Sequence, residues 1–337
     1  MKAVGFQQPG PIERQDALQD ITLEKPVAHG RDLLVEIKAV SVNPVDTKVR
    51  VNRQPQPDSW EILGYDAVGV VNAIGPAVEY FKVGDEVFYA GVINRSGTNS
   101  EFHLVDERIV GRKPTNLSDS EAAALPLTAI TAWEMLFDRL KVLRPTVEGG
   151  KLILVIGGAG GVGSITLQLL RAMTDLTIIA TASRPETKQW VMDSGAHHVI
   201  DHSQPLAQQM EALGLGKPGF VFSTTQTDRH YSDIVELIAP QGRFGLIDDP
   251  PTLDAKPLKM KSISLHWELM FTRPLFSTPD IDEQRTLLNQ VADLVEAGKI
   301  RSTATEVAGM INAANLKKVH AQLESNTTRG KIVLEGF

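Results

Sequence analysis

One segment, residues 151–163 with the sequence KLILVIGGAGGVG, constrains the fold more than any other part of the chain. Residues 152–156 form a continuous apolar run, which is typical of a strand buried on both faces of a parallel sheet. A glycine-rich turn follows, and the apolar residues after it recur at helical spacing. The segment therefore predicts a strand, a tight turn and a helix, in that order.

The glycines of this turn match the G-x-G-x-x-G pattern at Gly158, Gly160 and Gly163. The first glycine permits the tight turn, the second lets the backbone approach a pyrophosphate, and the third lets the helix pack close to the strand. The helix N-terminus then offers unpaired N–H groups and a partial positive charge to the phosphates. The pattern, in this context, predicts that the chain binds a dinucleotide.

Composition limits the alternatives. The chain has 337 residues, which predicts two domains, and it has no cysteine, which excludes disulfides, thiolate metal sites and a cysteine nucleophile. Its net charge of −7 argues against nucleic acid as a partner, because nucleic-acid-binding proteins present a basic face. No apolar run approaches the roughly 20 residues that span a bilayer, and the sequence MKAVGFQQPG lacks the apolar core of a signal peptide. We therefore expect a cytoplasmic protein without a membrane partner.

The chain changes character along its length, which predicts an α/β fold with two kinds of domain. Residues 1–125 contain many short strands punctuated by glycine and proline, as in a barrel-like β domain. From Lys151 onward strands alternate with short helices, which is typical of an open, doubly wound parallel sheet. We expect its strands at 152–156, 176–182, 198–201, 220–223 and 242–247, and helices at 128–140, 185–194, 205–213 and 231–238.

The end of the second strand of such a sheet selects the nicotinamide cofactor. An acidic residue there binds the ribose hydroxyls of NAD, whereas this chain has Ser183 and Arg184, with Lys188 one helical turn later. A hydroxyl and two cations suit a 2′-phosphate, because arginine grips phosphate with parallel hydrogen bonds. The pattern favours NADPH over NADH. The alternative is that these residues are ordinary charges of a solvated loop.

Seven segments spread over nearly the whole chain occur in a characteristic order: SVNPVDTKVR, ILGYDAVGVV, KVGDEVF, LPLTAITAWEML, GGAGGVG, ASRPET and TRGKIVL. Together they resemble the medium-chain dehydrogenase/reductase superfamily, in its zinc-independent quinone oxidoreductase branch, and bacterial proteins of the "zinc-type alcohol dehydrogenase-like" group. The resemblance implies a GroES-like catalytic domain of residues 1–125, completed by residues 272–337, and a central Rossmann domain of residues 126–271.

The residues in the metal positions of that superfamily do not suit a metal. Zinc alcohol dehydrogenases carry a cysteine where this chain has Asn43 and a histidine where it has Tyr65. Amide and phenol groups are poor zinc ligands, and the carboxylates of Asp46 and Asp66 alone do not make a tetrahedral site. The histidines of the sequence GAHHVIDH fall on a strand, where neighbouring side chains point to opposite faces. We expect no bound metal.

Without a metal, the resemblance implies an NADPH-dependent reductase that transfers a hydride to a quinone or an α,β-unsaturated carbonyl. The candidate catalytic residues are Asn43, Tyr65 and Asp46. Asn43 would donate a hydrogen bond to the carbonyl oxygen, and Tyr65 would donate a proton or a hydrogen bond. The alternative is that Asn43 before Pro44 only fixes a turn, that Tyr65 only packs, and that Asp46 supports the local backbone.

The resemblance also implies further cofactor contacts at the strand ends, at the junction helix and near the C-terminus. The alternative for each of these residues is a purely structural role, and Trp267 and Phe271 would line an apolar pocket or belong to the core or a subunit contact. Relatives often dimerise through the edges of their Rossmann sheets, which implies a homodimer through residues 262–265. The cofactor residues carried over are Thr128, Gly160, Gly161, Val162, Ser223, Thr224, Leu246, Ile247, Arg329 and Lys331.

Two other functions remain open on the sequence. One is a zinc-dependent alcohol dehydrogenase, and the other is an NADPH-binding regulatory protein with little turnover. Sensitivity of activity to a chelator distinguishes the first, and cofactor binding without turnover distinguishes the second.

Overall fold

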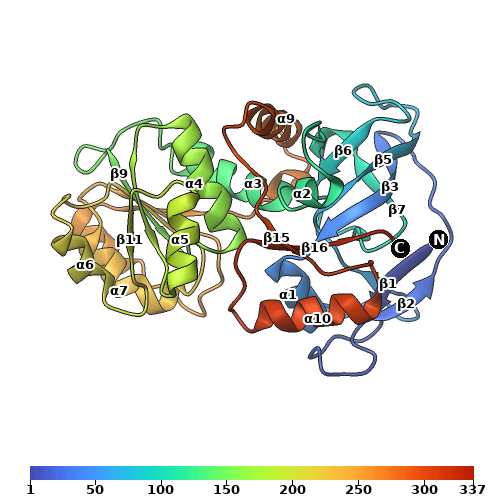
Figure 1. Cartoon of the computed structure of the whole chain (residues 1–337), viewed down its shortest axis with the longest axis horizontal. Helices are drawn as coiled ribbons and strands as arrows, with labels where there is room; N and C mark the ends of the chain where they lie inside the picture. Colours follow the sequence, from blue (N-terminus) through green and yellow to red (C-terminus); the bar gives the residue numbers. More distant parts are fainter. The chain divides into compact units, whose positions relative to one another are not determined.

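The structure, a computed structural model, describes all 337 residues of the chain, which form two compact units (Figure 1). The first, called the β unit here, combines Met1–Ile130 with Phe271–Phe337. The second, called the α/β unit, consists of Thr131–Met270. The β unit is therefore assembled from both ends of the chain, while the α/β unit is one continuous segment.

The β unit contains two sheets, in which most neighbouring strands pair antiparallel. In the larger sheet, the long strand β3 pairs with β5 on one side and with both β16 and β7 on the other, so that the last strand of the chain lies beside one of the first (Figure 1). Most side chains of β3 are buried, among them the neighbours Leu33, Leu34 and Val35, so this strand is covered on both faces. The strands are β1 (Lys2–Phe6), β2 (Gln19–Thr22), β3 (Asp32–Ser41), β4 (Glu61–Ile62), β5 (Ala67–Ile74), β6 (Glu86–Tyr89), β7 (Phe102–Asp106), β8 (Val110–Arg112), β15 (Ala304–Val307) and β16 (Lys331–Glu335).

The helices of the β unit include one that the sequence reasoning did not predict. A turn at Asn43 was the alternative to its catalytic role, and no helix was predicted there, but Pro44–Asn52 is the helix α1, with Asn43 as its N-cap and Asp46 completing a capping box. Proline at the first helical position fits this start, because its missing N–H has no partner there in any case. The other helices are η1 (Glu107–Ile109), α2 (Asp119–Ala123), α3 (Pro126–Trp133, which continues into the α/β unit), α8 (Thr272–Phe276), α9 (Glu283–Glu296) and α10 (Ala313–Glu324).

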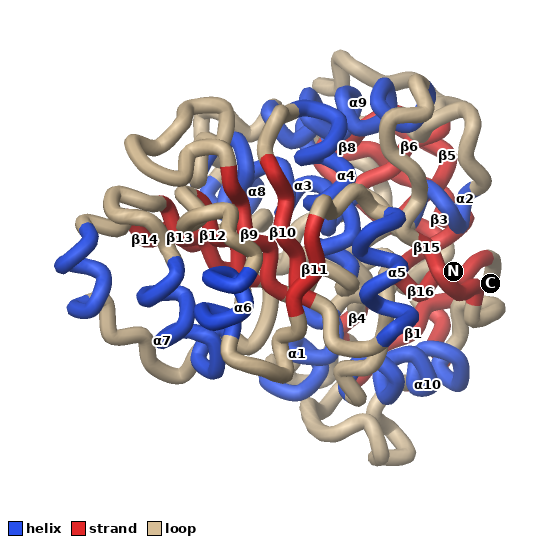
Figure 2. Tube along the Cα trace, turned by 60° about the vertical axis from the view of Figure 1, so that its left-hand side comes forward, coloured by secondary structure: helices blue, strands red, loops and turns tan.

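The α/β unit is built on a six-stranded parallel sheet in the order β11-β10-β9-β12-β13-β14 (Figure 2). The strand order reverses at β9, which is the arrangement of a doubly wound fold and places the ligand crevice at the carboxyl end of β9. The predicted fold class is confirmed. The strands are β9 (Leu152–Ile156), β10 (Thr177–Thr181), β11 (His198–Ile200), β12 (Phe220–Ser223), β13 (Arg243–Leu246) and β14 (Ser264–Trp267).

Two helices of the α/β unit differ from the predicted ranges. The helix expected at 128–140 changes to a π-helix after Trp133, where the N–H of Leu140 bonds to the carbonyl of Met135. The helix expected to begin at Tyr231 begins four residues earlier, because a carboxylate from a distant turn, Asp248, accepts a 2.8 Å bond from the N–H of Thr227. The helices are η2 (Glu134–Arg139), α4 (Gly161–Met173), α5 (Pro185–Asp193), α6 (Leu206–Ala212), α7 (Thr227–Leu237) and η3 (Lys256–Lys261).

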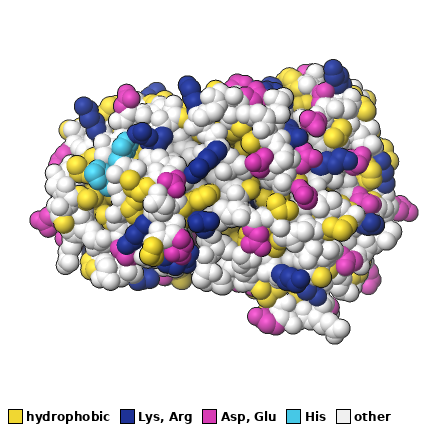
Figure 3. Space-filling model, viewed as in Figure 1, with side chains coloured by type: hydrophobic (Ala, Val, Ile, Leu, Met, Phe, Trp, Pro, Cys, Tyr) yellow, Lys and Arg dark blue, Asp and Glu magenta, His cyan; other side chains and the backbone are white.

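The surface carries no extended area of one charge on the face drawn in Figure 3, where cationic, anionic and apolar side chains are interspersed. None of the helices combines the length and apolarity that crossing a membrane requires.

Candidate functional site

The glycine turn after β9 has the close approaches that its pattern predicts. A Cβ at Gly163 would lie 2.3 Å from the carbonyl oxygen of Gly157 and 2.7 Å from the Cα of Gly158, so helix α4 packs directly on the turn. A Cβ at Gly160 would meet only the Gly157 oxygen, at 3.6 Å, so the turn is open on that side. The third glycine is therefore needed for packing, and the second leaves room beside the backbone.

The start of helix α4 presents unpaired donors. Gly160 is its N-cap and has no side chain to cap the helix, and the N–H groups of Gly161, Val162 and Gly163 have no acceptor within the helix. Three such donors, with the positive end of the helix dipole, form an anion-binding site. The residues present therefore fit the pyrophosphate of a dinucleotide.

The structure brings the other predicted residues of the sheet to the same edge. In register, Ile156 at the end of β9 lies beside Ser223 of β12, which lies beside Leu246 of β13. The Thr224 hydroxyl donates a 2.8 Å bond to the carbonyl of Ile156, which fixes the turn after β12 against the glycine turn. Ile247 follows directly and is half-buried. These strand ends adjoin the glycine turn, as the doubly wound fold requires.

The two cations after β10 have carboxylate partners. The Nε of Arg184 lies 2.7 Å from Glu186 Oε1, and the Nζ of Lys188 lies 3.1 Å from Asp201 Oδ2. Hydrogen bonds from Ser203 and Lys188 lower the pKa of Asp201 to about 2. All four side chains keep contact with solvent, so an incoming phosphate would compete with carboxylates for these cations. Ser183 precedes them and is half-buried. Glu186 stands two residues after Arg184 in the sequence, whereas Asp201 directly follows the next strand, β11.

In the β unit, the amide of Asn43 is fully engaged. Its Nδ2 donates a 2.8 Å bond to Asp66 Oδ2 and a 3.4 Å bond to the carbonyl of Ser41, and its Oδ1 accepts a short bond from the ammonium of Lys331. The side chain is buried. Asn43 therefore belongs to a buried polar cluster and has no spare donor for a substrate in this arrangement.

Asp66 and Lys331 form the centre of this cluster. The Nζ of Lys331 donates to Asp66 Oδ2 at 3.1 Å and to the carbonyl of Val42 at 3.0 Å, and burial lowers the pKa of the lysine. Asp66 also accepts 2.8 Å and 2.7 Å bonds from the Ser41 hydroxyl and the Leu127 N–H. Lys331 was expected at a cofactor phosphate, but its three N–H groups are all used inside the β unit. The pairing of Lys331 with Asp66 was not predicted from the sequence. The only local indication of it is that a lysine stands at the start of an apolar strand.

Asp46 supports the backbone, one of the two roles weighed for it. Its Oδ2 accepts a 2.7 Å bond from the N–H of Asn43, and its Oδ1 accepts a 2.9 Å bond from the N–H of Gly64. Burial raises the pKa of Asp46 to about 7 despite these bonds. The carboxyl thus joins the start of helix α1 to the residue before Tyr65.

Tyr65 has a buried hydroxyl without a hydrogen-bond partner. The ring is held edge-to-face by Phe271, with centroids 5.4 Å apart at an interplanar angle of 70°. Burial is the main reason that the pKa of Tyr65 is raised, the charge of Asp46 raises it further, and the charge of Arg53 lowers it. A buried O–H donor that the chain leaves unused is uncommon, because such a group loses its hydration without compensation.

The remaining predicted residues are placed as follows. Thr128 is buried in α3 and its hydroxyl donates a 3.1 Å bond to the carbonyl of Leu125. Arg329 is half-buried before β16, and its carbonyl accepts a 2.8 Å bond from Thr305. The Trp267 side chain is half exposed at the end of β14.

The side chains around Asn43 do not fit a zinc ion. The donors there are an amide, a phenol and a carboxylate already neutralised by an ammonium, whereas zinc takes thiolate, imidazole and free carboxylate. No group of three or more His, Asp or Glu side chains is arranged to hold a metal anywhere in the chain. Two of the histidines of the sequence GAHHVIDH have other partners. His197 Nε2 forms a hydrogen bond with Arg171, and His202 Nδ1 lies 3.1 Å from the Thr181 hydroxyl.

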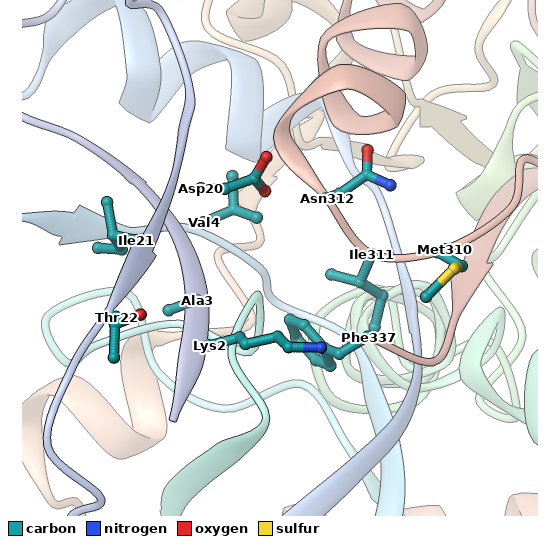
Figure 4. A pocket seen from close by; sticks show the side chains of 10 residues that line it. All are labelled: Lys2, Ala3, Val4, Asp20, Ile21, Thr22, Met310, Ile311, Asn312 and Phe337. Carbon is teal, nitrogen blue, oxygen red and sulfur yellow. The ribbon is translucent and has the colours of Figure 1, made fainter.

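A separate pocket of about 400 Å³ lies in the β unit between β1, β2, residues 310–312 and Phe337 (Figure 4). Lys2, Asp20, Thr22 and Asn312 are the polar side chains on its wall. None of the predicted site residues lines it, so it is not part of the candidate site.

Comparisons with known proteins assign the family. The "Alcohol dehydrogenase GroES-like domain" model matches residues 29–115, and the "Zinc-binding dehydrogenase" model matches residues 194–334. A "zinc-type alcohol dehydrogenase-like protein" of Staphylococcus aureus is 40% identical over 99% of both chains. A human mitochondrial NAD(P)H oxidoreductase is 30% identical, over 92% of this chain and 83% of its own.

Solved structures of similar proteins support the same family. A Rhizobium etli protein, provisionally assigned as a zinc-dependent alcohol dehydrogenase, has a TM-score of 0.98 at 61% identity and covers 100% of this chain and 98% of its own. The Escherichia coli quinone oxidoreductase complexed with NADPH has a TM-score of 0.82 at 23% identity over 99% and 100% of the chains, which shows a shared fold. Fold, family models and full-length relatives agree: the chain belongs to the medium-chain dehydrogenase/reductase superfamily of oxidoreductases.

Proposed function

We propose that this protein is an NADPH-dependent reductase that transfers a hydride to a quinone or an α,β-unsaturated carbonyl without a metal. The observation that carries the proposal is the buried cluster of Asn43, Asp66 and Lys331. It fills the region around position 43 with an ammonium–carboxylate pair in place of metal ligands. An acceptor that is activated by its own conjugation suits such a site, and quinones and enones are acceptors of that kind.

The protein's part in this reaction is to bind and orient. The nicotinamide, when bound, supplies the hydride. The glycine turn and the start of α4 hold the pyrophosphate through backbone N–H groups. In the β unit, the unused hydroxyl of Tyr65 donates to the carbonyl oxygen of the acceptor, where negative charge develops. Phe271 and the bonds of Asp46 to the neighbouring backbone hold Tyr65 in place.

The preference for NADPH rests on Ser183, Arg184 and Lys188 and on the absence of an acidic residue at the end of β10. Names of relatives support a nicotinamide cofactor, since they include an NAD(P)H oxidoreductase and an NADPH complex. A 2′-phosphate carries more negative charge than either single carboxylate, Glu186 or Asp201, and it replaces them as the partner of the two cations.

We also propose a cytoplasmic homodimer that forms through the edge of the α/β sheet. Strand β14 is the outermost strand on one side of that sheet, so one row of its backbone groups is unpaired. Trp267 and Leu269 are 50% and 51% exposed at its end. Pairing of two β14 edges would bury these groups in a second copy of the chain.

The function is tested by steady-state oxidation of NADPH with 1,4-benzoquinone and with 2-cyclohexen-1-one, in the presence and absence of EDTA. We expect turnover with both acceptors, unchanged by the chelator and faster at low NADPH than at equal NADH. Turnover that is lost with EDTA would instead identify a zinc-dependent dehydrogenase. Tight NADPH binding without turnover on any acceptor would identify a regulatory protein.

Replacement of both cations tests the cofactor preference. The R184A/K188A variant is expected to raise the KM for NADPH by about 10- to 100-fold, the value of one or two charge-assisted bonds, and to leave the KM for NADH unchanged. K299A, at an exposed lysine of the β unit, is the control. Equal effects on the two cofactors would contradict a role in binding the 2′-phosphate.

Replacement of Tyr65 by phenylalanine tests the hydroxyl alone, because the ring and its contact with Phe271 remain. We expect kcat to fall by about 100-fold, the lower end of what a positioned acid contributes, while the KM for NADPH stays unchanged. The melting temperature should hold or rise, since a buried donor without an acceptor is removed. A variant with wild-type kcat would show that Tyr65 only packs.

A further inference from the structure

The turn that follows strand β13 is held by a side chain that has no part in the function described so far. Asp248 stands two residues after the end of β13, at the carboxyl edge of the parallel sheet. Its Oδ2 accepts a 2.8 Å bond from the N–H of Thr227, and its Oδ1 accepts a bond from the Thr227 hydroxyl. One carboxylate therefore joins the turn after β13 to the first residue of helix α7.

Helix α7 depends on this carboxylate for its start. Its N-cap, Gln226, lies in the left-handed region with a φ of 50° and makes no side-chain capping bond. Such a conformation is uncommon for a residue other than glycine, and it persists where the surrounding structure over-determines it. The cap comes instead from Asp248, 21 residues after Thr227 in the chain.

The Thr227 hydroxyl extends this connection to strand β12. It lies 2.8 Å from the hydroxyl of Ser223, the last residue of that strand, and both side chains are buried. A carboxylate can only accept, so the single hydrogen of the Thr227 hydroxyl goes to Asp248, and the Ser223 hydroxyl donates to Thr227. The bonds thus fix three points of one edge, which are the end of β12, the start of α7 and the turn after β13.

The turn after β13 has few backbone donors of its own. Pro250 and Pro251 follow Asp248 closely, and neither has an N–H. Ile247 and Asp248 are only half-buried, so packing alone does not enclose them. The Asp248 side chain is therefore a link that fixes this turn to a neighbouring helix.

This turn lies on the side of the sheet that the nicotinamide half of a bound dinucleotide would reach. The glycine turn follows β9, and the two cations suited to the 2′-phosphate, Arg184 and Lys188, follow β10. Strands β12 and β13 lie on the other side of β9 (Figure 2). The two nucleosides extend in opposite directions from the pyrophosphate, so an adenosine over β10 directs the nicotinamide over β12 and β13. With strands about 4.8 Å apart, β13 is about 10 Å from β9, within the reach of one nucleoside.

We propose that Asp248 is a positioning residue for hydride transfer, which holds the turn after β13, through Thr227, as a wall of the nicotinamide site. This inference rests on the proposed function. Both oxygens of Asp248 are bonded to Thr227, so it acts through the backbone of residues 247–249 and not on the reacting atoms. A turn that is ordered before the cofactor arrives loses less conformational freedom on binding. A fixed wall also holds the nicotinamide ring at the distance that hydride transfer requires, and a displacement of about 1 Å lowers the rate by about 100-fold.

The test compares D248A, D248N and T227V with D254A. Asp254 is a matched control, because it lies in the same connection between β13 and β14, and its Oδ1 accepts a 2.9 Å bond from the N–H of Lys256 at the start of η3. Calorimetry gives the affinities for NADPH and for 2′,5′-ADP, which has the adenosine and the 2′-phosphate of NADPH without the nicotinamide. Steady-state kinetics with 2-cyclohexen-1-one give kcat.

We expect D248A to lower kcat by about 10- to 100-fold and the affinity for NADPH by about 10-fold, with unchanged affinity for 2′,5′-ADP. D248N should recover most of both losses, because its amide oxygen still accepts from the N–H of Thr227. T227V keeps that N–H and should show smaller losses with the same selectivity. D254A should match the wild type in all three measurements, although it also loses a capping bond.

Two results would overturn the inference. The first is wild-type kcat and NADPH affinity in D248A. The second is an equal loss of affinity for NADPH and 2′,5′-ADP, which would leave Asp248 as a helix cap with a purely structural role. If D248A does not fold, T227V decides in its place, and a T227V protein without selective loss of NADPH affinity would contradict the inference.

The inference and the proposed function fail separately. If the wild-type protein reduces no quinone or enone, the function is wrong, yet selective loss of NADPH affinity in D248A would still identify Asp248 as a residue that positions the nicotinamide half. If the wild-type protein reduces these acceptors and D248A does so equally well, only the inference is wrong. A wild-type protein that binds neither NADPH nor 2′,5′-ADP would refute both.

Discussion

Replacing Gly163 by alanine is expected to abolish NADPH binding and to destabilise the α/β unit. The added Cβ would lie 2.3 Å from the carbonyl oxygen of Gly157 and 2.7 Å from the Cα of Gly158, and both neighbours are backbone atoms that cannot rotate away. Helix α4 must therefore move off the turn, which takes the N–H groups of Gly161 and Val162 away from the phosphate position. Overpacking of this kind costs about 1–3 kcal/mol of unfolding free energy.

Calorimetry with NADPH and urea denaturation measure the two effects of G163A. The matched variant is G160A, whose Cβ would meet only one oxygen, at 3.6 Å, and therefore fits the free protein. We expect G160A to keep the stability of the wild type and to lose NADPH affinity, because the methyl group occupies the side that the pyrophosphate approaches. Wild-type affinity in both variants would refute phosphate binding at this turn.

Replacing Lys331 by methionine is expected to cause the largest loss of stability in the β unit. Removal of one member of a buried ion pair leaves the other charge uncompensated and costs about 3–5 kcal/mol. Here the Asp66 carboxylate would keep its bonds from Ser41, Asn43 and Leu127 and would lose its only cation. Urea denaturation measures the loss.

A second substitution separates the effect of the buried charge on the free energy of unfolding from the effect of packing. In the K331M/D66N variant the buried charge is gone, and the new amide oxygen at position 66 can still accept from the N–H of Leu127, so we expect about half of the stability to return. K38M serves as the surface control, because Lys38 and Glu36 form an exposed pair whose loss costs less than about 1 kcal/mol. If K331M lowered the free energy of unfolding by less than about 1 kcal/mol, the buried pair would not stabilise the β unit.

The α/β unit could be predicted from the sequence because its signals are local. The apolar run of β9, the glycine turn and the pattern of α4 lie within one short segment, and each agrees with the others. The helix α1 was missed for the opposite reason. Asn43 before Pro44 is a frequent turn sequence, and the Asp46 carboxyl that completes the capping box also depends on Gly64, which comes later in the chain.

The centre of the buried cluster could not be predicted, since 265 residues separate Asp66 from Lys331. They meet only because β16 pairs with β3 in a register that sets Val333 beside Ser41 and so brings Lys331 to Val42 and Asn43. No sequence pattern near Lys331 indicates that register.

The closure of the β unit by β16 has a consequence for synthesis on the ribosome. The first 130 residues emerge early, yet their sheet lacks its partner strand, and Asp66 lacks its counter-ion, until β16 has left the exit tunnel. The continuous α/β segment has by then emerged in full and is free to fold. The residues of the β unit that are translated first are therefore completed last, and termination within β16 leaves an intact α/β unit attached to an unfinished β unit.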